Sequence, residues 1–132
     1  MKKNIPLIVA TLLAAVSVQA AELVVITHPS ASAVSKEQVS DVFLGKSQAF
    51  TPIDQPESSA TYADFYKKAT GRDVSQVKST WSRIVFSGKG QPPKQLPDSA
   101  AVKKAVSADP KAIGYIDKSA LDGSVKTALT LD

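Results

Sequence analysis

The sequence contains no cysteine, which removes several classes of protein at once. Disulfide frameworks, thiolate metal sites and cysteine nucleophiles are excluded, so packing alone must hold the fold together. We also expect no lipoprotein-type anchor, because such an anchor needs a cysteine at the cleavage site. Histidine occurs once, at His28. It could act as a base or a metal ligand, but no second histidine accompanies it, and we favour a loop residue without either role.

Motifs that carry catalysis are equally scarce. The carboxylates are scattered singly, without the spacing of an acid/base pair or a metal site. No serine stands in a nucleophile-elbow sequence, and Gly88 and Gly90 lack the spacing of a phosphate-binding P-loop. We therefore predict that the protein is not an enzyme, with no catalytic residues, no metal and no cofactor.

The chain also lacks a strong charge of either sign. Its formal charge is +4, but Lys2 and Lys3 stand in a terminal segment, and without them 14 basic side chains face 12 acidic ones. No run of lysine and arginine is present. We therefore expect no nucleic-acid partner.

The first 20 residues have the pattern of a secretory signal peptide. A basic start leads into an apolar run from Ile5 to about Val16, and small residues precede a cleavage point near Ala20. The run is too short for a comfortable membrane span, and no later stretch is apolar enough to insert. We therefore expect residues 1–20 to be a signal peptide and residues 21–132 to form a single periplasmic domain.

Three segments read as strands. Residues 22–27 and 112–116 are short apolar runs typical of buried strands. Residues 124–131 alternate, which predicts a half-exposed edge strand with one inward row. The inward row is expected to be Val125, Thr127, Leu129 and Leu131.

Four segments read as helices, with a fourth short strand possible at residues 51–54. Ser35 and Gln38 form a capping box for the helix that ends at Gly45. A second helix covers about residues 59–70, and Asp73 with Gln76 caps a third. The fourth begins at Asp98 or Ser99, after an exposed lysine-bearing loop at residues 87–97. The apolar stripe of the third helix is Val74, Val77, Trp81, Ile84 and Val85. The order of elements indicates an α/β sandwich with a small central sheet.

The start of the second helix, within "DQPESSATYADF", is rich in hydroxyl side chains. Ser58, Ser59 and Thr61 could cap the helix, which is ordinary local chemistry. The first N–H groups of a helix also attract oxyanions, and small hydroxyl residues let an anion approach and add donors. Glu57 opposes an anion there. The local sequence therefore favours a helix cap, and an anion-binding site is the alternative interpretation.

Three segments resemble one family, the periplasmic phosphate-binding proteins of ABC phosphate transporters. "SKEQVSDVFLGK" at residues 35–46 is similar to their "L-x-x-x-x-L-x-x-I-F-x-G-K" segment, and "PKAIGYID" at residues 110–117 to their "P-G-A-I-G-Y-V" segment. Residues 59–61, Ser-Ala-Thr, with Phe65 four residues on, stand where the family has "S-G-T" and a phenylalanine. The segments occur in the same order at compatible distances, and the match runs through essentially all of residues 21–132.

The resemblance implies a type 2 periplasmic-binding-protein fold, of which this chain has sequence for one lobe. Full-length members close two lobes over their ligand. Short single-lobe relatives, usually labelled phosphate ABC transporter substrate-binding proteins, look similar over the full length. We therefore expect a single three-layer α/β lobe, with a small mixed sheet flanked by roughly four helices.

The chain departs from the family at the expected site. Family members carry an arginine four residues before "S-G-T" and an aspartate two residues before it; the corresponding residues here are Gln55 and Glu57. Ala60 replaces the glycine. Glutamine supplies one amide but no charge and no guanidinium fork. Lys46, or a lysine from residues 89–94, could replace the missing cation if the fold brings it near.

Two functions follow as hypotheses. The first is weak binding of phosphate or a similar oxyanion, with an affinity on the order of millimolar, or roughly −4 kcal/mol, for delivery to an ABC transporter permease or report to a sensor ectodomain. The second is a degenerate lobe that acts without ligand as a protein-interaction or sensor-accessory module, with another envelope protein or a second copy as partner. The candidate ligand-binding residues are Ser58, Ser59, Ala60, Thr61 and Gln55.

Overall fold

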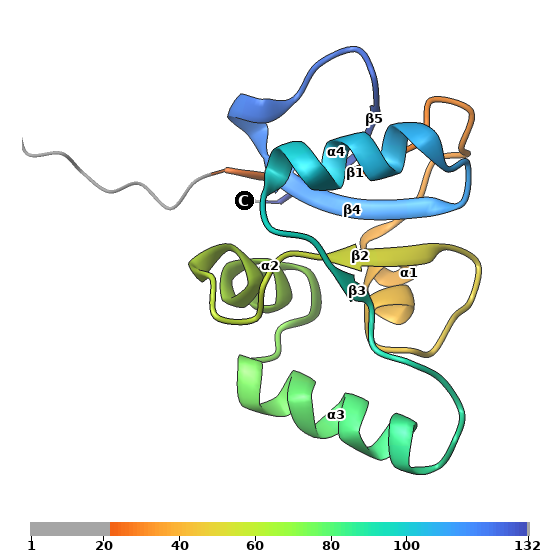
Figure 1. Ribbon diagram of the computed structural model, residues 1–132, viewed down its shortest axis with the longest axis vertical. Helices are drawn as coiled ribbons and strands as arrows, with labels where there is room; N and C mark the ends of the chain where they lie inside the picture. The colour runs from red at the N-terminus through yellow and green to blue at the C-terminus, as the bar shows by residue number, and fades with distance from the viewer. Residues whose placement is uncertain (1–21, 132) are drawn as a thin grey trace, which may run out of the picture.

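The computed structural model describes residues 22–131, so the expected signal peptide at residues 1–20 lies outside the described residues. Five strands within this range form one sheet in the order β3-β2-β4-β1-β5 (Figure 1). The strands are β1 Leu23–Thr27, β2 Thr51–Asp54, β3 Lys94–Gln95, β4 Ala112–Asp117 and β5 Lys126–Leu131.

The sheet is mixed, as expected. Strand β1 pairs antiparallel with both β4 and β5, and its register sets Val25 opposite Tyr115 and Leu129. Strand β2 runs parallel to β3 and to β4. The two-residue strand β3 lies inside the segment that we expected to be only an exposed loop, and it pairs with the outer side of β2.

The helices begin and end where the local sequence predicts. They are α1 Lys36–Phe43, α2 Ala60–Thr70, α3 Val74–Phe86 and α4 Ser99–Ala108, with a short 3₁₀ turn η1 Lys118–Ala120. Both capping boxes form: Gln38 closes on Ser35, and Gln76 closes on Asp73. Gly71 ends α2 with a φ of 73°, a conformation that glycine adopts without strain. None of these helices has the length and apolarity that crossing a bilayer requires.

Two apolar cores lie on opposite faces of the sheet, which makes the described chain three layers. Helix α4 covers one face through Val102 and Val106. On the other face, α1 and α2 bury an aromatic cluster in which Phe65 stacks on Tyr115 at 3.8 Å between ring centroids. Helix α3 lies on the outside of this second layer, at the foot of Figure 1, and contributes Val77 and Trp81. The aromatic residues expected in the core are buried there: Phe43, Tyr62, Phe65, Tyr66, Trp81 and Tyr115.

Close contact between α4 and β4 depends on Gly114. A Cβ atom at this position would lie 2.5 Å from Cγ1 of Val102 and 3.3 Å from Cγ2 of Val106. The absence of a side chain therefore lets α4 pack directly on the strand. This contact fixes the start of α4 relative to the end of β4.

The expectation of one inward row along residues 124–131 is wrong. Val25 pairs with Leu129 but Ile26 pairs with Thr127, so a β-bulge at Ala128 shifts the register of β5. As a result Val125 packs in the core under α4, whereas Leu131 packs in the opposite core. The alternation that we read as one inward row is divided between two faces.

Four of the five residues expected in the apolar stripe of α3 pack in or against the core, namely Val74, Val77, Trp81 and Ile84, and only Val85 does not. Val77 is fully buried and Trp81 is nearly so, but Val85 is 41% exposed and the following Phe86 is 95% exposed. These two residues are the exposed large hydrophobic residues of the described range. Two large apolar side chains therefore face solvent side by side.

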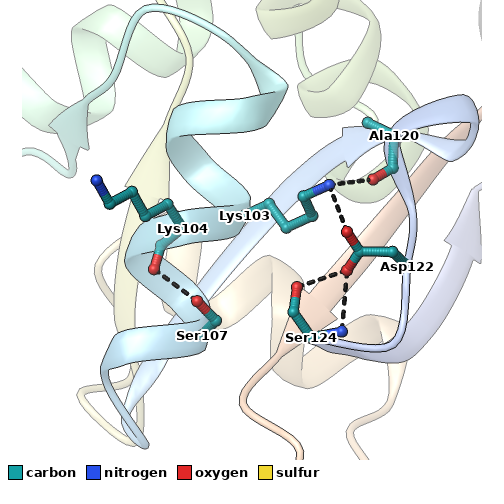
Figure 2. A network of polar contacts seen from close by, with 6 residues as sticks. All are labelled: Lys103, Lys104, Ser107, Ala120, Asp122 and Ser124. Atoms are coloured by element: carbon teal, nitrogen blue, oxygen red, sulfur yellow. Dashed lines mark hydrogen bonds and ion pairs between the residues drawn. The ribbon is translucent and has the colours of Figure 1, made fainter.

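The connection between β4 and β5 is held against α4 by Lys103 (Figure 2). Lys103 Nζ donates to the carbonyl of Ala120 at 2.8 Å and to Oδ2 of Asp122 at 2.8 Å. Oδ1 of Asp122 accepts from the amide and the hydroxyl of Ser124. The hydrogen bond from Lys103, followed by those from Ser124, holds the pKa of Asp122 well below its usual range.

Candidate functional site

The candidate residues lie at one edge of the sheet, where the parallel strands β2 and β4 end. Five residues separate the end of β2 from the start of α2, and this helix packs on one face. Helix α4 starts at Ser99 beside the same edge and packs on the other face. Ligand sites of open α/β sheets lie outside the carboxyl ends of strands where successive helices diverge in this way.

Ser59 is the cap of α2. Its Oγ accepts a hydrogen bond from the amide of Tyr62 at 3.2 Å and donates to the carbonyl of Pro56 at 2.7 Å. The single hydroxyl proton of Ser59 is therefore committed inside the protein. The expected cap is confirmed, and in this geometry Ser59 offers a ligand only lone pairs.

The other hydroxyl residues leave donors free on the exposed side of this turn. Ser58 is exposed and Thr61 is half-buried. Within residues 22–131 the amides of Ala60 and Thr61, which occupy the first two positions of α2, donate no hydrogen bond. The start of α2 thus presents two backbone N–H groups and two hydroxyls at the positive end of the helix dipole.

Gln55 lies under this turn rather than on it. It is 5% exposed, and its Nε2 donates to the carbonyl of Tyr115 at 3.0 Å and to Oγ of Ser99 at 3.2 Å. Both amide hydrogens are therefore used inside the fold. The side chain links the end of β2 to β4 and to the start of α4.

Asp117 ends β4 at the same edge. Its amide donates to Oγ of Ser99 at 3.1 Å, and its Oδ2 lies 3.5 Å from that hydroxyl. Its Oδ1 is buried without a hydrogen-bond partner among the described residues. The first turn of α4 begins at Ser99, and its dipole favours a negative charge at this place.

Asp54 is the residue that sequence reasoning missed. Its carboxyl is 2% exposed and accepts a hydrogen bond from the hydroxyl of Tyr66 at 2.8 Å and from that of Tyr115 at 2.9 Å. Burial raises the pKa of Asp54 from 3.8 to about 7, although both tyrosines act to lower it. The available signal was a carboxyl at the end of a short strand together with two core tyrosines, whose buried hydroxyls need partners.

The charged groups around the start of α2 do not favour an anion strongly. Glu57 forms an ion pair with Lys78 of α3, with 3.3 Å between Oε1 and Nζ. Lys78 is thus the cation that the fold brings near, and it is already paired. Lys46 and the lysines of residues 89–94 do not line the hollow that adjoins Asp54 and Glu57.

This hollow lies between α3 and residues 92–95, beside the start of α2. Its volume is about 470 Å³, and its walls are mostly apolar. Trp81 forms one wall and is fixed there because its Nε1 donates to the carbonyl of Phe43 at 3.0 Å. The polar part of the lining includes Asp54 and Glu57.

Residues 22–131 contain no candidate metal centre. No three histidine or carboxylate side chains in this range are grouped so that they could hold a metal ion. What the edge does provide is a donor-rich helix start next to a hollow that contains carboxylates.

No protein-family model matches the chain, and no curated protein is significantly similar to it. Solved structures do match. An ABC-type phosphate transport receptor from Vibrio cholerae superposes with a TM-score of 0.61 at 16% identity, covering 81% of this chain and 45% of the receptor. A putative phosphate ABC transporter substrate-binding protein with bound phosphate from Clostridium perfringens superposes with a TM-score of 0.63 at 18% identity. The match covers 81% of this chain and 44% of that protein. PstS from Borrelia burgdorferi superposes with a TM-score of 0.53 at 18% identity, and the match covers 74% of this chain and 41% of PstS.

The chain spans less than half the length of each of these proteins. At this level of identity the likeness concerns the fold, which agrees with the five-stranded mixed sheet and its four helices. The expected resemblance is confirmed in that respect: the chain has the fold of one lobe of a phosphate ABC transporter substrate-binding protein.

Proposed function

We propose that this protein is an exported, single-lobe relative of phosphate-binding proteins that binds phosphate or a similar oxyanion weakly at the start of α2. The observation that carries the proposal is the exposed turn with four donors, two amides and the hydroxyls of Ser58 and Thr61, at the carboxyl edge of β2. An anion placed there gains charge-assisted hydrogen bonds and the favourable end of the helix dipole. That two of the similar structures are of phosphate transport proteins supports the choice of anion.

The surroundings set the expected strength. Gln55 uses its amide hydrogens inside the fold, and Glu57 stands two residues before the cap with its charge offset by Lys78. The turn is open to water, so each hydrogen bond to the anion replaces one to solvent and contributes little net free energy. We expect a dissociation constant on the order of millimolar, or roughly −4 kcal/mol.

A phosphate titration of the isotope-labelled domain, followed by amide NMR with sulfate in parallel, tests this function. Saturable shifts should be confined to the amides of residues 58–62. The double variant Ser58→Ala with Thr61→Ala should weaken them at least several-fold and keep the cap at Ser59. Ser75→Ala is the matched control. Ser75 occupies the second position of α3, just as Thr61 occupies the second position of α2, and its side chain is exposed.

Flat spectra into the tens of millimolar would refute the oxyanion site, and so would shifts that the double variant leaves unchanged. Micromolar or tighter binding would contradict the energetic argument, since an open turn with one paired cation cannot supply it.

A specific observation favours protein interaction as a second function. Val85 and Phe86 are adjacent, large, apolar and exposed at the end of α3, and such neighbours on a surface mark contact sites. Light scattering of the wild type and of Phe86→Ser over a range of concentrations tests self-association. A mass that rises with concentration only in the wild type supports this function, and a constant monomer mass in both rules out a second copy as the partner.

A further inference from the structure

The hollow beside α3 differs in chemistry from the start of α2 that it adjoins. The helix start offers donors, whereas the hollow is lined by two acidic residues, the nearly buried Asp54 and the exposed Glu57. Its volume of about 470 Å³ suits a small organic molecule. An anion-binding turn and a site for a group of the opposite charge can therefore stand side by side without competing for the same ligand.

Charged and apolar groups are placed at different positions along α3. Lys78, which pairs with Glu57, is eight residues before Phe86, or about 12 Å along the helix axis. Trp81 and Val85 lie between them on the helix and line the same hollow. A ligand lying along α3 thus meets acids at one end and apolar, aromatic surface over the rest.

We propose that this hollow binds a small organic cation, an amine or guanidinium carried on an aromatic or aliphatic body. The cationic group lies toward Asp54 and Glu57, and the body packs against Trp81 and Phe86. This inference does not rest on the proposed oxyanion site, because it uses different side chains.

The charge balance selects a cation. Asp54 and Glu57 together carry two negative charges when ionised, and Lys78 offsets one of them. A cation meets the remaining negative charge, whereas an anion meets two carboxylates and one lysine that is already paired. Tyr62 and Trp81 line the hollow as well, and their ring faces attract cations when these are partly removed from water.

The same arrangement predicts that the affinity of the hollow for a cation depends on pH. The groups that face Asp54 are Tyr62 and Tyr66 of α2 and Tyr115 of β4; Glu57 and Lys78 line the hollow with it. Burial raises the pKa of the three tyrosines, so their hydroxyls stay neutral, and Asp54, with a pKa of about 7, is the group that titrates near neutrality. Affinity for a cation should rise from pH 6 to pH 8, by up to about tenfold.

Trp81 makes the test direct, because it is the single tryptophan of the chain and it lines the hollow. We would titrate the protein with benzylamine, benzyl alcohol and benzoate, which share one aromatic body and differ in charge. Benzylamine should change the fluorescence saturably, benzyl alcohol at least fivefold more weakly, and benzoate least of all.

Variants at exposed positions locate the binding without threatening the fold. Glu57→Gln and Phe86→Ala should each weaken benzylamine binding several-fold, and Glu37→Gln, which removes an exposed acid from α1, should not. Asp54→Asn should remove the pH dependence. If that variant does not fold, Glu57→Gln and Phe86→Ala still decide the question.

Three outcomes would overturn the inference. These are equal affinity for all three probes, binding that neither Glu57→Gln nor Phe86→Ala alters, and fluorescence that changes with protein concentration alone. The last would mean that a second copy occupies the hollow. The phosphate titration reads backbone amides at residues 58–62, whereas the benzylamine titration reads the fluorescence of Trp81, so failure here and failure of the proposed function are distinguishable.

Discussion

Replacement of Asp54 by asparagine should remove most of the dependence of stability on pH between 5 and 8. The wild-type carboxyl is 2% exposed, and burial raises its pKa from 3.8 to about 7. Between these two values the folded state binds more protons than the unfolded state, so the free energy of unfolding falls as pH rises. Asparagine has nearly the same shape and does not ionise, so the variant should be almost flat over this range.

The magnitude follows from the shift in pKa. At 1.36 kcal/mol for each pKa unit, the difference between 3.8 and about 7 corresponds to roughly 4 kcal/mol. This stabilisation is fully present below pH 3.8 and is lost once the pH passes 7. Integrated over the two titrations, roughly 3 kcal/mol of the loss falls between pH 5 and pH 8.

Urea unfolding at pH 5, 6, 7 and 8, followed by the fluorescence of Trp81, measures this dependence. Glu37→Gln serves as a control for loss of an exposed acid, and His28→Gln as a control for the single histidine. The reasoning would be refuted if Asp54→Asn kept the wild-type slope, or if wild-type stability rose from pH 6 to pH 8. Either result would mean that the two tyrosine hydroxyls hold Asp54 ionised despite its burial.

Two further substitution pairs test the packing. Gly114→Ala should cost about 1–3 kcal/mol, because the new Cβ would overlap Val102, whereas Gly123→Ala meets nothing within 4 Å and should be nearly neutral by chemical denaturation. Trp81→Ala should cost about 3–5 kcal/mol, since it empties part of the core and removes a buried hydrogen bond. Phe86→Ala should change stability by no more than about 0.5 kcal/mol, because its side chain is 95% exposed; similar thermal-melt losses for the two would contradict the structure.

Helix boundaries are the part of this fold that the sequence predicts well, because their determinants are local. The capping boxes at Ser35 and Asp73 involve residues three positions apart, and Gly71 ends a helix through its own conformation. Each signal lies within one turn of the feature it specifies. The strands at residues 22–27 and 112–116 are equally readable, since both are buried on two faces.

The sheet edges and the candidate site depend on contacts that local sequence does not contain. The bulge at Ala128 is defined by the pairing of β5 with β1, and the strand at Lys94–Gln95 is defined by its pairing with β2. Asp54 owes its raised pKa to burial in the folded core, where it accepts a hydrogen bond from Tyr115, 61 residues later. Gln55 is similar: the sequence places it near the helix start, but only the fold shows that its amide is bonded to Ser99 and β4.

The oxyanion site at residues 58–61 with Gln55 remains a prediction. The structure brings Ser58, Ala60 and Thr61 onto one exposed turn, and it places Ser59 and Gln55 in internal hydrogen bonds. The sequence alone could not divide these residues in this way, because all five are small or polar and lie within one short segment.

The position of β1 has a consequence for when the protein can fold. This first strand is bonded on both sides to the last two strands, with Leu23 opposite Asp117 and Leu131, the latter 108 positions away. A growing chain therefore cannot pair β1 until the central strand β4 has been made, and the sheet stays incomplete until β5 joins its edge. Such distant pairing slows folding, because a long loop must close before the contacts that reward it can form. With this strand order, the strands that pair with β1 are made late in synthesis, so most of the sheet forms only after residues 112–131 have been made.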